Sequence, residues 1–181
     1  MLSVLLFAAC KKESDDLANT SSSTQGIENL RKARPFKATL NAAVDINSLN
    51  PPTTCSGVVP FTAPDFLLSG NATHMGQINV QLSRLHHVSC DVSIVTMLLT
   101  TNVSVELAAA NGDIIYCSGN DVIDVSKLLT QTGTTGTISG TWTITGGTGR
   151  FNGASGSFTI NGLVDFVTNT FNCECIGTVN Y

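Results

Sequence analysis

The sequence predicts an all-β fold, with a single antiparallel β-barrel of about eight strands over residues 35–181. Three observations predict it. Apolar residues alternate with Thr, Ser and Asn in many short segments. Turn-forming residues are frequent, with 16 glycines, while only 12% of the residues are charged. No long segment has a convincing helical pattern, and closing the sheet removes both exposed edges, so a barrel is the simplest arrangement.

The segment 1–9, MLSVLLFAA, is interpreted as the remnant of an export signal. Nine residues cannot cross a bilayer, which needs about twenty. The AAC sequence that ends at Cys10 resembles the lipobox of bacterial lipoproteins, which implies that Cys10 carries lipid and anchors the protein to a membrane. The segment departs from that pattern at Phe7, where leucine is usual, and in having no basic residues before it.

Residues 10–34 are expected to be a lipidated, flexible tether, because LANTSSSTQGI at 17–27 is polar and of low complexity. The KKESDD segment at 11–16 resembles segments that direct some bacterial lipoproteins to the outer face of the outer membrane; an ordinary soluble tail is the alternative. The expected location is the bacterial cell envelope, as an outer-membrane lipoprotein on the periplasmic face or at the cell surface.

Charge limits the partners of the folded domain. From residue 38 onward there are three basic residues and nine acidic ones. An acidic body repels phosphate backbones, so no nucleic-acid partner is expected.

The first part of the domain contains three expected strands. Alternation predicts a strand from Phe36 to about Val44 and a strand-like segment at 66–71. Between them, 47–64 holds four of the five prolines and is predicted to be a long irregular connection. Apolar residues at 78, 80 and 82 alternate with polar ones and predict a further strand at 78–82.

A reversal is expected at His86, His87 and Cys90, followed by a long apolar run at 92–107. The Asn-Gly pair at 111–112 predicts a two-residue hairpin that returns from residue 114. A short helix is expected at 124–129.

The segment 137–166, TISGTWTITGGTGRFNGASGSFTINGLVDF, predicts a hairpin around the glycine-rich turn 146–154. The alternation directs four large side chains to one core: Trp142, Ile144, Phe158 and Ile160. A last strand is predicted at 170–181.

GGTGRFNGASGSFTI at 146–160 resembles the signature GGTGRF-x-GA-x-G of the dirigent and allene oxide cyclase-like β-barrels. ATHMG at 72–76 and AANGD at 109–113 resemble segments of uncharacterised secreted bacterial members. The resemblance covers about 36–181 and implies an eight-stranded antiparallel barrel. Plant members are often dimers or trimers with an apolar interior pocket, which implies a homo-oligomer and a small apolar ligand as partners. No motif here matches the acids and arginines of the plant enzymes, so no catalytic residue is carried over.

With Cys10 lipidated, five cysteines remain, and in an exported protein they are expected to form disulfides: Cys55, Cys90, Cys117, Cys173 and Cys175. The expected pairs are Cys55 with Cys90, and Cys117 with either Cys173 or Cys175. Cys173 and Cys175 lie two residues apart on one strand face, a poor geometry for bonding each other. Metal ligation by these two with Cys117 or a histidine is the alternative, but the sequence predicts neither a metal site nor a cofactor.

His74 shares the parity of residues 78 and 80, which would direct it into the barrel unless a bulge intervenes at Gly76. A buried, hydrogen-bonded structural histidine is favoured, and an acid-base role is the alternative. No paired carboxylates, Ser-His-Asp arrangement or phosphate loop stand out.

The sequence therefore favours a lipid-anchored envelope protein whose barrel is a binding or structural module, rather than an enzyme. The alternative is an isomerase or cyclase that acts on a small apolar molecule inside the barrel, with His74 as the acid-base group. A barrel filled by its own side chains would exclude that alternative. A eukaryotic secreted dirigent-like protein, glycosylated at Asn71 and Asn102, is a third hypothesis, against which the lipobox argues.

Overall fold

The structure, a computed structural model, describes residues 32–57 and 60–181. The interpreted signal segment 1–9, Cys10 and nearly all of the expected tether therefore lie outside the described residues. Within the described ranges, no helix has the length and apolar character needed to cross a membrane.

Eight long strands make up most of the domain: β1 (Arg34–Val44), β5 (Phe66–Ala72), β7 (Arg84–Ser93), β8 (Leu98–Ala108), β9 (Ile114–Asp124), β10 (Thr135–Gly147), β11 (Ser155–Asp165) and β12 (Thr170–Asn180). The shorter elements are β2 (Thr53–Thr54), β3 (Ser56–Gly57), β4 (Thr62–Ala63), β6 (Gly76–Gln77), the helix α1 (Ser126–Leu129) and a 3₁₀ turn, η1 (Gly149–Phe151). The predicted all-β fold is confirmed, as is a short helix within 124–129.

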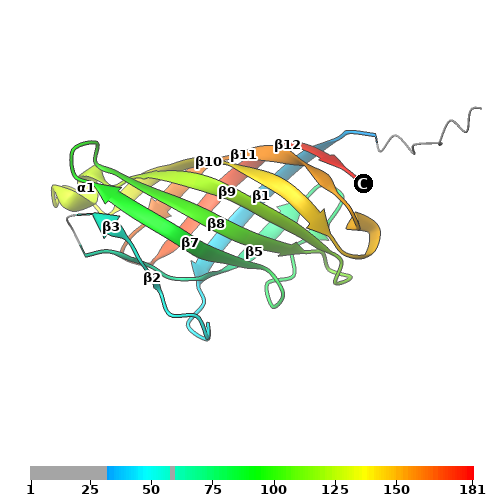
Figure 1. Ribbon diagram of the computed structural model, residues 1–181, viewed down its shortest axis with the longest axis horizontal. Helices are drawn as coiled ribbons and strands as arrows, with labels where there is room; N and C mark the ends of the chain where they lie inside the picture. The colour runs from blue at the N-terminus through cyan, green and yellow to red at the C-terminus, as the bar shows by residue number, and fades with distance from the viewer. Residues whose placement is uncertain (1–31, 58–59) are drawn as a thin grey trace, which may run out of the picture. The chain divides into compact units, whose positions relative to one another are not determined.

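The eight long strands form a closed ring (Figure 1). They pair in the order β7-β8-β9-β10-β11-β12-β1-β5, and β5 pairs in turn with β7. All eight pairings are antiparallel. The glycine-rich hairpin is confirmed as β10–β11, with Trp142 opposite Phe158.

The middle of the ring is filled by the protein's own side chains. Trp142, Phe36 and Phe158 are fully buried. The ring centroids of Phe36 and Phe158 lie 4.8 Å apart, and those of Trp142 and Phe158 lie 5.7 Å apart. Glycine provides the space that this packing needs, because a Cβ on Gly119 would lie 2.6 Å from Cδ1 of Trp142. The four core side chains predicted from the hairpin are all buried.

The strand predicted at 78–82 is wrong. β6 ends at Gln77, before this segment, and within it Ile78 makes an isolated bridge to Ala109. The amide of Ile78 donates to the Gly70 carbonyl at 2.9 Å, so the chain folds back across the end of β5. Val80 and Leu82 are accordingly 37% and 44% exposed rather than in the core.

The reversal predicted at His86–Cys90 is also wrong, because these residues lie inside β7. A β-bulge shifts the register between His87 and Ser89. Leu85 and His87 therefore face inward before the bulge, and Cys90 faces inward after it, although its parity differs. The chain reverses instead at 94–97, and the β8–β9 connection spans 109–113 rather than two residues.

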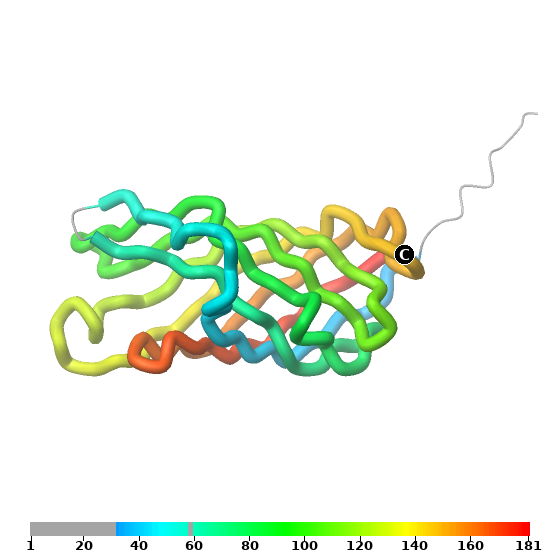
Figure 2. Tube along the Cα trace, turned by 90° about the horizontal axis from the view of Figure 1, so that it is seen from below, coloured from blue at the N-terminus to red at the C-terminus, as the bar shows by residue number. Residues whose placement is uncertain are grey.

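The connection predicted to be irregular at 47–64 forms a strap, here defined as residues 45–57 and 60–65. β5 pairs with β7 at only two positions, Phe66 with Leu85 and Leu67 with Arg84. The strap covers the remaining edge of β7: β3 pairs with it in parallel, and the Thr53 hydroxyl donates to the His87 carbonyl. Figure 2 shows the cyan strap running beside the green β7.

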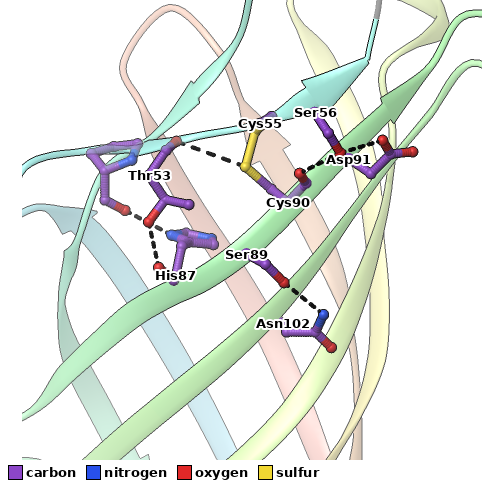
Figure 3. Close-up of a disulfide and its surroundings, with 9 residues drawn as sticks. Thr53, Cys55, Ser56, His87, Ser89, Cys90, Asp91 and Asn102 are labelled. Carbon is purple, nitrogen blue, oxygen red and sulfur yellow. Dashed lines mark hydrogen bonds between the residues drawn. A yellow bond between two sulfur atoms is a disulfide. The ribbon is translucent and has the colours of Figure 1, made fainter.

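A disulfide between Cys55 and Cys90 fastens the strap to β7, as Figure 3 shows. This predicted pair is confirmed. The predicted bridge from Cys117 to Cys173 or Cys175 is absent, and all three are free, buried thiols. Cys117 lies on β9 and the other two on β12, with β10 and β11 between these strands in the sheet.

We expect the double substitution Cys55→Ala/Cys90→Ala to lower the free energy of unfolding by about 3–4 kcal/mol, because the bond closes a loop with a sequence separation of 35. Urea unfolding measures the change. A reductant should destabilise the unsubstituted protein by the same amount and leave the double variant unchanged. If reduction leaves the stability of the unsubstituted protein as it was, the strap does not depend on this bond.

Candidate functional site

An apolar cavity lies where the strap meets one end of the ring. Its volume is about 60 Å³, room for about four water molecules. Three phenylalanines line it, together with aliphatic residues, short polar residues and one histidine: Phe61, Thr62, Ala63, Pro64, Phe66, His87, Leu99, Ile123, Val164, Phe166 and Asn169. Apolar walls with a few polar groups are typical of small-molecule sites.

His87 supplies the titratable side chain of this cavity. It comes from β7 and is 6% exposed, with its ring 5.8 Å from that of Phe66 in an edge-on contact. Nδ1 lies 2.8 Å from the Pro64 carbonyl oxygen. Because a carbonyl can only accept, Nδ1 carries the proton and donates. Nε2 of the neutral ring is therefore the acceptor.

Burial lowers the pKa of His87, and the Pro64 carbonyl and the charge of Asp65 oppose this only in part. The imidazole is therefore neutral at pH 7. It can accept a hydrogen bond or a proton from a molecule in the cavity.

Buried carboxylates hold the two ends of the strap. Asp45 accepts from Nε of Arg84 at 3.2 Å, and its own amide donates to the Asp65 carbonyl. Asp65 accepts from Ser48 and Asn50 and lies 2.7 Å from Nδ1 of His86. Burial alone would raise the pKa of Asp65, but these hydrogen bonds together lower it. The strap residues over the cavity are thus fixed at both ends and by the disulfide.

Asp121 is the one carboxylate enclosed by the ring among the described residues, at 1% exposed. Its Oδ1 accepts from Nε1 of Trp142 at 2.8 Å. Burial raises the pKa of Asp121 to about 7, and the tryptophan hydrogen bond only partly opposes this. Opposite it on β8 is Thr101, whose buried hydroxyl has no hydrogen-bond partner.

Two of the free cysteines, Cys117 and Cys175, are poor nucleophiles. Burial raises the pKa of Cys117 to about 12. The pKa of Cys175 is also raised, most by a hydrogen bond with Cys173 and next by burial. A reactive cysteine needs a thiolate, which this interior disfavours. Over residues 32–57 and 60–181, no group of three or more His, Cys, Asp or Glu side chains is arranged to hold a metal ion.

His74, the acid-base candidate from the sequence, is not beside the cavity. It lies in the turn after β5 with a left-handed backbone, φ 67°. Its Nε2 is 2.9 Å from the Pro35 carbonyl oxygen, and its ring contacts Tyr181. These contacts agree with a hydrogen-bonded structural role, but the expected burial inside the barrel is wrong, because His74 is half-buried in a turn.

Sequence reasoning missed both His87 and Asp121. His87 was assigned to a turn because the bulge hides the alternation of β7. Asp121 shares the parity of Cys117 and Ile123, so the period-2 alternation along β9 is the signal that could have found it.

We expect Asp121→Asn to change the pH dependence of stability, because its folded pKa of about 7 lies above the ordinary 3.8. The folded state binds this proton more tightly, so the contribution of Asp121 to stability is fully present below pH 4 and is lost as pH rises towards 7. Asparagine keeps an acceptor for Trp142 without the charge. Relative to the unsubstituted protein, the variant's free energy of unfolding should therefore be higher by up to about 4 kcal/mol at pH 8 and nearly equal at pH 4.

Urea unfolding at the two pH values measures this effect, with the exposed Glu106→Gln as the matched control, which should show no such difference. An equal effect of Asp121→Asn at pH 4 and pH 8 would contradict the raised pKa.

No family model and no curated protein matches this sequence. Among solved structures, the chain is similar to a dirigent protein described as a pterocarpan synthase, with 14% sequence identity and a TM-score of 0.43. The match covers 83% of this chain and 86% of that one. The likeness is one of fold, and it supplies no residue role or activity for this chain.

Proposed function

We propose that this protein is a lipid-anchored protein of the bacterial cell envelope whose ring of strands is a β-barrel that binds a small apolar molecule. The observation that carries the binding function is the apolar cavity under the strap, which combines aromatic walls with one neutral histidine. The lipobox-like sequence at Cys10 supports the anchor and the envelope location.

The cavity indicates the chemistry of the ligand. Its phenylalanine and aliphatic walls favour an apolar group, and its volume suits one end of a molecule rather than a whole drug-sized ligand. Nε2 of His87 favours a hydrogen-bond donor on the ligand. The best match is an apolar molecule with a hydroxyl group at the end that enters.

Binding is better supported than catalysis. Among the described residues that line the cavity, His87 is the one ionisable side chain, and none of them supplies a second acid or base to complete a reaction. An isomerase or cyclase acting in the middle of the ring is poorly supported, because aromatic side chains fill that space and His74 lies outside it.

We expect Ala63→Leu to weaken binding of the uncharged fluorescent probe N-phenyl-1-naphthylamine by about tenfold or more, because the larger side chain occupies the cavity. Ala43→Leu makes the same change on the outer face of β1 and should leave binding unchanged. Thermal unfolding checks that both variants fold. Equal probe binding by Ala63→Leu and the unsubstituted protein would contradict a site at this cavity.

The anchor predicts that expression of the full chain in a lipoprotein-processing bacterium yields acylated Cys10 in the membrane fraction. Mass spectrometry of the N-terminal peptide measures acylation, and Cys10→Ser should move the protein to the soluble fraction. If Cys10→Ser still partitions with membranes, the lipid anchor is wrong. The binding function is tested separately by the Ala63→Leu titration and would not be affected by that result.

A further inference from the structure

The outer face of β7 to β10 carries an open groove of about 690 Å³, independent of the cavity under the strap. Its exposed polar lining consists of hydroxyl and amide side chains: Thr100, Asn102, Ser118, Asn120, Thr141 and Thr143. None of the described residues that line it is charged. The groove is thus a neutral polar surface on a domain with an acidic charge balance.

Strand register arranges these side chains in rows. Asn102 on β8 lies opposite Asn120 on β9, which lies opposite Thr141 on β10. Ser118 lies opposite Thr143 in the next row along the strands. Neighbours within a row are about 4.8 Å apart, the spacing between strands. A ligand along a row would therefore meet a polar side chain on each strand.

Most of these groups are free to bind a ligand. Asn102 donates to the Ser89 hydroxyl at 2.8 Å. The other five side chains make no hydrogen bond to any described part of the chain. Hydroxyl and amide groups both donate and accept, so they can pair with a ligand that does the same.

The composition of the groove selects among ligand classes. A charged ligand would lose hydration without gaining an opposite charge, and an apolar ligand would leave the hydroxyls and amides unpaired. At the edge, Val88 is 61% exposed where the β7 bulge pushes it outward. It offers an apolar contact for the C–H face of a sugar ring.

We propose that this groove binds a neutral polysaccharide chain. The polyhydroxyl ligand would pair with the free side chains across β8 to β10 and pack a sugar ring on Val88. The groove uses outward-facing side chains and the cavity uses inward-facing ones such as Leu99 and Ile123, so the two sites do not compete for residues.

The test is titration of the ¹⁵N-labelled full chain with cellohexaose, maltohexaose and chitohexaose, followed by amide chemical shifts. We expect at least one of these hexasaccharides to produce saturable shifts on β8, β9 and β10. Asn120→Ala/Thr141→Ala should weaken that binding by about tenfold or more, since two hydrogen bonds are lost. An anionic oligogalacturonide of the same length should not bind.

The matched control is Asn161→Ala/Thr137→Ala, which removes the same two residue types from exposed positions on β11 and β10 outside the groove. It should leave hexasaccharide binding unchanged. The proposal is overturned by an absence of saturable shifts with all three neutral sugars, by equal losses in the two double variants, or by tighter binding of the oligogalacturonide.

Discussion

The structure depends on how its ring of strands closes. The seam between β5 and β7 contains only two residue pairs, so β7 continues past its neighbour with unpaired backbone groups. The strap pairs with that edge through β3, and the Cys55–Cys90 disulfide holds it there. The same strap places Phe61 and Pro64 over the end of the ring. The strap that covers the exposed edge of β7 therefore also forms part of the wall of the apolar cavity.

The filling of the ring decides where a ligand can be held. Trp142 occupies the middle only because Gly119 leaves space for its indole, and Gly140 does the same for Asp121, where a Cβ would lie 2.5 Å from Oδ1. The buried hydrogen bond gives the indole N–H of Trp142 an acceptor and the carboxyl group of Asp121 a donor. Burial still raises the pKa of Asp121, so this carboxyl group resists ionisation. A ligand in the middle would have to displace this packing, whereas the cavity at the end and the outer groove offer space without doing so.

Regular alternation made much of the fold predictable. The β10–β11 hairpin, the first and last strands and the Cys55–Cys90 pair follow from period-2 patterns and from the position of a cysteine in a proline-rich connection. The candidate site was not predictable in the same way. One bulged residue, Val88, reverses the inward and outward sides of β7, and this hides the burial of His87. The seam is a long-range register between β5 and β7, and no local pattern encodes it.

The two ends of the ring are formed by different parts of the chain. β1 begins at Arg34 opposite Val179, beside the C-terminal end of the chain, whereas the strap and the cavity follow the other end of β1. Figure 1 shows α1 at the end opposite the C-terminus. The cavity therefore lies at the end of the ring opposite the start of β1. The outer groove lies along the side of the ring, on β8, β9 and β10, and shares no lining residue with the cavity, so a polysaccharide chain bound there would leave the cavity free.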